Sequence, residues 1–185
     1  MMKTVITIIG LALMTYNPSL AKKTSSTPTQ LAFNSANWRI TNDGVMGGLS
    51  QGNVVKVNGD IVFTGQISTE NNGGFSSTYT ALPPLKEGIE TVNITVTGDG
   101  NDYQLRFRSL FRGYLIGYKL EFPTKANQTI SHQLSLRDAQ ATFRGRLISN
   151  APTLSSDSIR DIGVLISSKT PTPFHITLHN ISFSE

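Results

Sequence analysis

Two short polar segments contain the residues of this chain that are best suited to chemistry. The first is N-D-G-V-M-G-G-L-S at residues 42–50, and the second is E-N-N-G-G-F-S-S at residues 70–77. Carboxylate and amide groups beside exposed backbone N–H groups can contact a sugar, a metal ion or a peptide. Glycine pairs allow backbone angles that are closed to other residues. Both segments are therefore predicted to be shaped loops on either side of a strand at Asp60–Ser68.

The same two segments also have a purely structural interpretation. Asn, Asp and Gly dominate turns because they hydrogen-bond locally and accept a positive φ. Both interpretations stay open from the sequence. The polar candidates for a partner-binding site are Asn42, Asp43, Glu70, Asn71 and Asn72. The residues predicted to shape the two loops are Gly47, Gly48, Gly73 and Gly74.

Four arginines form a second candidate group. Arg106 and Arg108 are two positions apart in a predicted strand, so both side chains point to the same face. Arg144 and Arg146 repeat this spacing around a glycine. Guanidinium groups match carboxylates in shape and charge, which predicts a partner-binding face beside the glycine loops at one end of the domain. A solvated, salt-bridged sheet surface is the structural alternative.

The remaining chemistry-bearing residues do not predict catalysis, a metal site or a cofactor. His132, His175 and His179 are the only histidines, and zinc usually needs a further suitably placed ligand. The chain has no cysteine, which removes disulfides, thiolate ligands and thiol nucleophiles. A G-x-S-x-G motif is absent, and no Ser–His–Asp grouping is suggested by spacing. The protein is predicted not to be an enzyme.

The N-terminus is typical of an export signal. Lys3 precedes an apolar run at Val5–Met14, and Ser19-Leu20-Ala21 has the small residues of a cleavage site. We predict a signal peptide at residues 1–21, with an uncleaved membrane anchor as the alternative. A flexible linker at 22–30 and one domain at 31–185 are predicted to follow. The apolar run is too short to cross a bilayer of about 30 Å, so no stable membrane span is expected after cleavage. The mature protein is expected to be periplasmic or extracellular.

The net charge and the pattern of apolar residues indicate the class of partner and the fold. The formal net charge of +4 is too small an excess to predict nucleic-acid binding. Short alternating segments predict an all-β, jelly-roll-like sandwich without helices of ten or more residues. Thr91–Thr97 is expected to pair with Tyr103–Leu110 as a hairpin, and a bulge is expected at His179-Asn180. Further strands are predicted at 114–122, 130–136, 141–148, 162–167 and 174–183. The predicted core includes Trp38, Phe63, Phe75, Val96, Leu105, Phe107, Leu165, Phe174 and Ile176.

Several motifs together resemble a known family. Trp38 precedes N-D-G-V-M-G-G-L-S, and F-T-G-Q-I-S-T-E-N-N-G-G-F-S-S, G-D-G-N-D-Y-Q-L-R-F-R, F-R-G-R, I-G-V-L-I-S-S-K and P-F-H-I-T-L-H-N-I follow in order. In these motifs the chain resembles the complex I intermediate-associated protein family. The resemblance implies a β-sandwich similar to galactose-binding domains and a non-catalytic, chaperone-like role in assembling respiratory complex I.

The sequence therefore favours two possible functions. The first is a protein-binding, assembly-factor module, whose partner the sequence does not identify. The alternative is an exported carbohydrate-binding module on the same kind of fold. Tyr114 and Tyr118 have the same parity in one predicted strand, so the sequence leaves open a small aromatic platform for a sugar.

Overall fold

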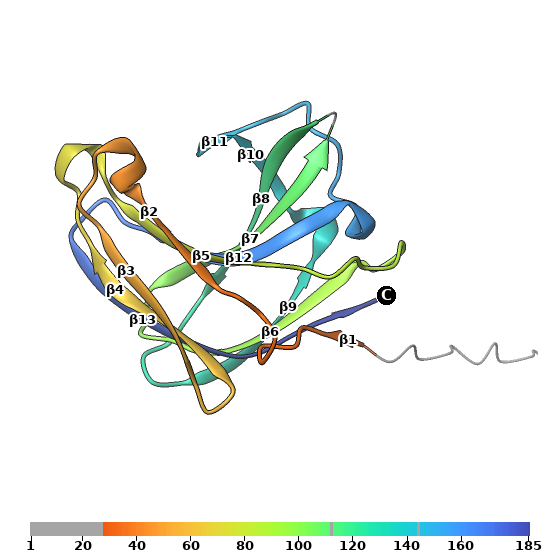
Figure 1. The fold of residues 1–185 in the computed structure, drawn as a ribbon, viewed down its shortest axis with the longest axis horizontal. Helices are drawn as coiled ribbons and strands as arrows, with labels where there is room; N and C mark the ends of the chain where they lie inside the picture. The colour runs from red at the N-terminus through yellow and green to blue at the C-terminus, as the bar shows by residue number, and fades with distance from the viewer. Residues whose placement is uncertain (1–27, 112, 144) are drawn as a thin grey trace, which may run out of the picture.

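The computed structural model describes residues 28–111, 113–143 and 145–185. The predicted signal peptide, most of the predicted linker and Arg144 lie outside these ranges. Within them the chain is a sandwich of two antiparallel sheets, which confirms the predicted all-β fold (Figure 1). Among the described residues, no helix is long and apolar enough to cross a membrane.

The first layer, here called the six-stranded sheet, contains the strands nearest the two chain ends. Its order is β3 (Gln51–Val57), β4 (Asp60–Ile67), β13 (Thr172–Ser184), β6 (Thr91–Thr97) and β9 (Thr129–Ser135), and β1 (Thr29–Gln30) pairs with β13. The described chain therefore joins the sheet two residues before the predicted domain start at Leu31. The register of β13 against β6 shifts between Leu178 and Asn180, which confirms the predicted bulge.

The second layer is the seven-stranded sheet. Its order is β11 (Arg146–Leu147), β10 (Gln140–Phe143), β8 (Tyr114–Pro123), β7 (Asp102–Phe111), β12 (Ile159–Ser167), β5 (Phe75–Ala81) and β2 (Arg39–Asn42). Short 3-10 turns connect the strands at η1 (Asp43–Met46), η2 (Glu70–Asn72), η3 (Leu136–Asp138) and η4 (Ser156–Ser158). The predicted strand at 141–148 is thus a hairpin, in which Phe143 pairs with Arg146 around Gly145 at φ +78°.

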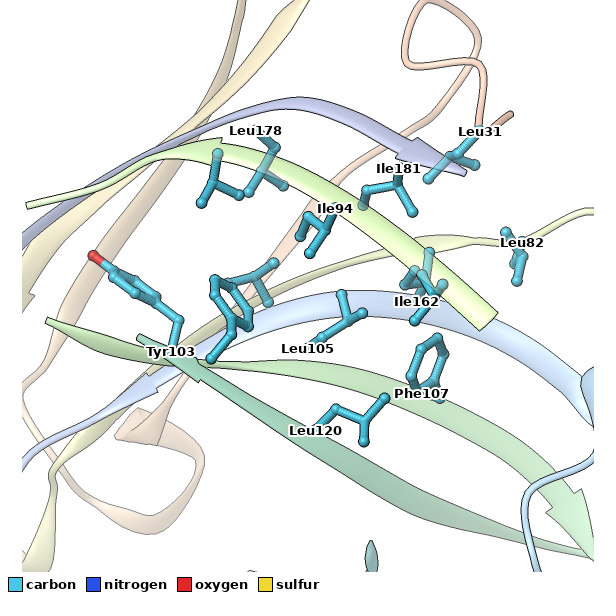
Figure 2. Packing of buried hydrophobic residues seen from close by; sticks show 14 of the residues in the cluster. Leu31, Leu82, Ile94, Tyr103, Leu105, Phe107, Leu120, Ile162, Leu178 and Ile181 are labelled. Atoms are coloured by element: carbon cyan, nitrogen blue, oxygen red, sulfur yellow. The ribbon is translucent and has the colours of Figure 1, made fainter. Parts of the chain in front are cut away.

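The core fills the space between the sheets, because each strand buries alternate apolar residues on its inner face. Ile94 and Ile181 of the six-stranded sheet point toward Leu105, Phe107 and other inner residues of the seven-stranded sheet (Figure 2). Six of the nine predicted core residues are buried, namely Phe63, Val96, Leu105, Phe107, Phe174 and Ile176. Trp38 and Phe75 are half-buried, and Leu165 lies on the outer face because Ile162, Val164 and Ile166 occupy the inner positions of β12.

The predicted hairpin between β6 and β7 is wrong. β6 pairs with β13 and β9, whereas β7 pairs with β8 and β12, so the turn at residues 98–101 crosses between the sheets. Asp99 holds this crossing: its Oδ2 accepts hydrogen bonds from Tyr103 Oη at 3.0 Å and from the His175 amide at 2.6 Å. The crossing lets both strands bury their apolar faces against each other, and a hairpin in one sheet would not allow this.

The predicted close approach at one strand glycine is present. A Cβ built on Gly65 would lie 2.0 Å from the Gln51 carbonyl oxygen and 2.8 Å from the Phe174 ring. Only glycine fits at this position of β4, where the neighbouring strand and an aromatic ring meet.

Candidate functional site

The two glycine loops meet at one buried carboxylate, that of Asp43. Its Oδ1 accepts a hydrogen bond from the Ser50 amide at 3.0 Å, and its Oδ2 accepts one from Ser50 Oγ at 2.5 Å. The Oδ2 atom also accepts from the amides of Gly74 at 2.7 Å and Phe75 at 3.2 Å. Ser50 and Gly74 belong to different loops, so Asp43 joins the segment after β2 to the segment before β5. We call this arrangement the Asp43 clamp.

The environment of Asp43 favours its charged form. The residue is 1% exposed, and burial alone raises the pKa of a carboxyl group. The hydrogen bonds from the Ser50 side chain and from the Gly74, Phe75 and Ser50 amides more than offset this effect and lower the pKa below 3.8. The carboxylate is therefore ionised at neutral pH and is fully engaged within the chain.

Two glycines make room for the clamp. A Cβ on Gly48 would lie 2.4 Å from Asp43 Cγ, and a Cβ on Gly73 would lie 2.7 Å from Asp43 Oδ2. Gly47 and Gly74 have positive φ values of +90° and +133°, which L-residues with a side chain rarely adopt. All four glycines predicted to shape the loops thus have a specific reason to lack a side chain.

The other polar residues of the loops lie in two settings. Asn42 is half-buried, and its side-chain oxygen accepts a hydrogen bond from Ser76 Oγ at 2.6 Å. Glu70, Asn71 and Asn72 are exposed on the η2 turn, where both asparagines have positive φ. Asp43 and Asn42 therefore face inward to hold the loops, and the three η2 residues are the ones open to solvent.

The arginines of β7 lie on the outer face of the seven-stranded sheet. Arg106 donates to Gln104 Oε1 at 3.2 Å and to Thr142 Oγ1 at 2.8 Å. The Arg108 guanidinium carbon lies 3.8 Å above the centre of the Tyr79 ring, a cation–π geometry. Both side chains are half-buried, and neighbours on other strands fix their positions.

The same face has an excess of positive charge. Arg39 and Lys119 have acidic neighbours, since Arg39 reaches Asp161 at 3.9 Å and Lys119 reaches Glu121 at 2.6 Å. Asp161 stands opposite Arg108 in the strand register, yet its carboxylate pairs with Arg39. Within the part of the chain that is described, neither Arg106 nor Arg108 forms an ion pair, and Arg106 Nε is buried without a hydrogen-bond partner. We call Arg106, Arg108, Tyr79, Gln104 and Thr142 the arginine face.

The structure separates residues that were expected to lie together. The glycine loops are at the β2 edge of the seven-stranded sheet, and β10 and β11 form the opposite edge (Figure 1). Arg146 lies on β11, two strands beyond β8, and Arg144 is outside the described residues. Only Arg106 and Arg108 of the four arginines therefore lie side by side among the described residues.

The residues that contact the two arginines were not predicted from the sequence. Tyr79 lies on β5, whose sequence F-S-S-T-Y-T-A has no alternation of apolar and polar residues. The inner positions of β5 are Ser76, Thr78 and Thr80, which are buried although they are polar. The one available signal was Gly163, which pairs with Tyr79 and leaves space for its ring, since a Cβ there would lie 2.6 Å from Tyr79 Cδ1.

The structure does not contain the small tyrosine platform that the sequence left open. Tyr118 is 1% exposed and donates its hydroxyl to the Pro152 carbonyl at 2.9 Å, whereas Tyr114 is 72% exposed at the end of β8. The β-strand places Tyr118 on the inner face, so the two rings do not form one surface. On the arginine face, the Tyr79 ring is 6% exposed because Arg108 covers it.

The histidines have structural contacts. His179 joins Asp60 Oδ2 at 2.9 Å through Nδ1 and Thr97 Oγ1 at 2.7 Å through Nε2. His132 packs against Phe122, and burial lowers its pKa below 6.5 although a hydrogen bond to the Pro123 carbonyl opposes this. No group of three potential metal-ligating side chains occurs in the ranges that the structure describes.

Comparison with known proteins identifies the family. Residues 25–178 match the sequence profile described as complex I intermediate-associated protein 30 (CIA30). The chain belongs to the CIA30 family. This confirms the resemblance carried by the two glycine motifs and the arginine-bearing strands. No curated protein sequence matches the chain.

Solved structures similar to this CIA30 domain include carbohydrate-binding modules. The family 11 carbohydrate-binding module of cellulosomal cellulase Lic26A-Cel5E from Clostridium thermocellum has a TM-score of 0.66 at 11% identity, over 88% of this chain and 97% of that chain. The same organism's module in complex with a β-1,3-1,4-mixed-linked tetrasaccharide has a TM-score of 0.64 at 13% identity, covering 86% and 97%. A family 30 carbohydrate-binding module has a TM-score of 0.53 at 14% identity, covering 86% and 84%. At these identities the similarity shows the shared β-sandwich fold.

Proposed function

We propose that this CIA30 domain is a non-catalytic assembly factor that binds an acidic segment of a protein partner on the arginine face. Family membership supports the assembly role, because the family is described by its association with complex I intermediates. The observation that carries the proposed site is the pair Arg106 and Arg108, which lie side by side without a carboxylate partner among the described residues.

The geometry of the two arginines suits a carboxylate ligand. Tyr79 stacks under Arg108, and Gln104 and Thr142 orient Arg106, so both guanidinium groups are held before a partner arrives. Preorganised guanidinium groups lose less conformational entropy on binding and can form paired hydrogen bonds to a carboxylate. The buried Arg106 Nε–H is a donor that a bound carboxylate could satisfy only with a small side-chain shift.

Carbohydrate binding is the second candidate, and the similarity of the fold to carbohydrate-binding modules is its support. Sugar rings commonly stack on aromatic side chains, but the Tyr79 ring on the arginine face is covered by Arg108. A sugar would therefore depend on hydrogen bonds to the guanidinium groups rather than on stacking. The protein partner is the better match to this surface.

In-cell photo-crosslinking tests the proposed site. A photoreactive phenylalanine at Gln140, which is exposed next to Lys119 on the same face, should crosslink to one discrete protein. The double variant Arg106→Gln/Arg108→Gln should lose this product, and Arg137→Gln should keep it. Arg137 is a suitable control because it is exposed on η3 and its ion pair with Glu90 contributes little to stability.

The outcomes separate the two functions. A crosslink that persists in a folded double variant would refute the arginine face as the partner site. Arg108→Gln alone is the back-up variant, because Arg106 also bonds Thr142 across strands. Specific binding of the unmodified protein on a glycan array, lost in Arg108→Gln, would instead favour the carbohydrate-binding function.

We also propose that the protein acts outside the cytoplasm, since Lys3, the apolar run and Ser19-Leu20-Ala21 have the order of an export signal. Cell fractionation with N-terminal sequencing should recover the mature protein in the periplasm or medium, beginning at Lys22. Recovery in the cytoplasm with complex I subunits would refute export and favour the role in the family name.

A further inference from the structure

The ends of two neighbouring hairpins expose a cluster of large apolar side chains. Among the described residues with large apolar side chains that are exposed, five of eight belong to the β7–β8 and β10–β11 hairpins. These residues, here called the hairpin patch, are Leu110 (50% exposed), Tyr114 (72%), Leu115 (53%), Phe143 (50%) and Leu147 (65%). Exposed apolar clusters of this kind mark interaction sites. In Figure 1 the two hairpins stand next to each other at one end of the molecule.

The hairpin patch has apolar side chains on both sides of the sheet. Leu110 pairs with Leu115, and both have the parity of Arg108 on the outer face. Leu147 pairs with Thr142, which bonds Arg106 on that same face. Tyr114 and Phe143 have the opposite parity and lie beyond the edge of the core, where they remain exposed. A flat partner surface covers one side of a hairpin end, whereas a bilayer interface can surround both sides.

The two hairpins also have a marked charge asymmetry. Residues 103–119 and 139–156, which include them, contain no Asp or Glu although the whole chain has 12 acidic residues. The same ranges contain Arg106, Arg108, Arg112, Lys119, Arg144 and Arg146. Basic residues beside apolar side chains are attracted to anionic lipid headgroups, and Tyr and Phe are stable at the level of those headgroups.

We infer that the hairpin patch binds the surface of a membrane that contains anionic lipids. The exposed leucines and aromatic rings enter the boundary between headgroups and acyl chains, and the flanking arginines contact lipid phosphates. Binding of this kind is peripheral and reversible, and it leaves most of the arginine face at the side of the hairpins available to a protein partner.

Vesicle flotation tests this inference on the full chain. Vesicles of phosphatidylglycerol and phosphatidylcholine in equal amounts should bind the protein, and vesicles of phosphatidylcholine alone should bind it weakly. Leu115→Ser/Leu147→Ser should lower the partition coefficient at least about tenfold, because two exposed leucines no longer enter the lipid. The matched control is Val55→Ser/Val57→Ser, which replaces two residues of β3 that are 42% and 46% exposed. The apolar run at residues 5–14 contributes equally to every variant, so only the difference between variants is used.

A fluorescent reporter gives a second readout at the patch itself. Tyr114→Trp should show a blue-shifted emission with anionic vesicles, and Val57→Trp should not, each measured against the signal of the single native Trp38. Equal flotation of the Leu115→Ser/Leu147→Ser variant and the control would overturn the inference. So would an unshifted emission of the Tyr114→Trp variant, or a dimer in solution that the two leucine substitutions convert to a monomer, since the patch would then be covered by a second copy.

Discussion

Replacing Asp43 with asparagine tests whether the clamp between the two glycine loops is a main support of the fold. The carboxylate accepts four hydrogen bonds while it is 1% exposed. Asparagine has nearly the same shape, so it leaves the space beside Gly48 and Gly73 unchanged. The substitution therefore removes charge and one acceptor without a steric change.

The expected cost follows from the four bonds. The asparagine carbonyl can stay at the Oδ2 position and accept from Ser50 Oγ and from the Gly74 and Phe75 amides. Hydrogen bonds to a charged group contribute about 1.5–3 kcal/mol and neutral ones about 0.5–1.5 kcal/mol, so these three lose about 1 kcal/mol each. The asparagine NH₂ group then faces the Ser50 amide N–H, and because both groups are donors, no hydrogen bond forms between them. Easier burial of the neutral side chain offsets part of the loss, and we expect a net loss of about 3 kcal/mol in the free energy of unfolding.

Urea unfolding at pH 7 measures this loss. The control is Asp138→Asn, an exposed residue of η3, which should change the free energy of unfolding by less than about 0.5 kcal/mol. Amide hydrogen exchange at Gly74 and Phe75 should accelerate in Asp43→Asn. The pH dependence gives an independent check. Because the pKa of Asp43 is lower in the folded than in the unfolded protein, its contribution is complete above pH 3.8 and is lost below that value. A loss below about 1 kcal/mol at pH 7, or one that persists unchanged in strong acid, would refute the reasoning.

Three further substitutions test the fold around the proposed sites. Gly73→Ala should cost about 1–3 kcal/mol, because its Cβ would lie 2.7 Å from the Asp43 carboxylate, whereas Gly44→Ala has no atom within 4 Å and should be nearly neutral in the same denaturation assay. Because burial lowers the pKa of His132, this residue should lower the unfolding free energy as the pH drops below 6.5, and His132→Phe should remove that contribution and reduce the pH dependence between pH 7.5 and 5.5. Tyr118→Ala should lower the unfolding free energy by about 3–5 kcal/mol, since the ring is buried in the core. A Tyr118→Ala protein that melts at the native temperature would contradict the structure.

The sequence predicts the strands that alternate and misses those that do not. β4, β6, β7 and β8 lie within a residue or two of their predicted bounds, because each alternates large apolar and polar residues. β5 was missed because its inner positions carry serine and threonine. Alternation does not predict which strands pair. β6 and β7 are consecutive and both amphipathic, yet they belong to different sheets. The Asp99 crossing that separates them depends on contacts with Tyr103 and His175, the latter 76 residues away.

The candidate site was predictable in part for the same reason. The spacing of Arg106 and Arg108 correctly places both on one face, since strand parity is a local property. The two arginines lack an ion pair because the carboxylates of Asp161 and Glu121 pair with Arg39 and Lys119 instead. This choice of partner depends on the neighbouring strands. The sequence also left open whether Asp43 faces a partner or its own backbone, because an Asp-Gly turn has the same residues in both cases.

The distribution of satisfied and unsatisfied groups suggests where binding occurs. The glycine loops have the composition of a ligand site, but the Asp43 carboxylate and the Asn42 side-chain amide oxygen accept hydrogen bonds from within the chain, so these two residues have little capacity left for a ligand. The arginine face has the opposite character: Tyr79, Gln104 and Thr142 position two cations whose charge no described carboxylate neutralises. A buried hydrogen-bond donor without a partner lowers the stability of a fold. The Arg106 Nε–H group is such a donor, so an anionic partner that supplies an acceptor would stabilise the protein. The glycine loops lie at one edge of the seven-stranded sheet, and the basic, apolar hairpins lie at the other. The arginine face between them is therefore the surface best suited to bind an acidic protein partner.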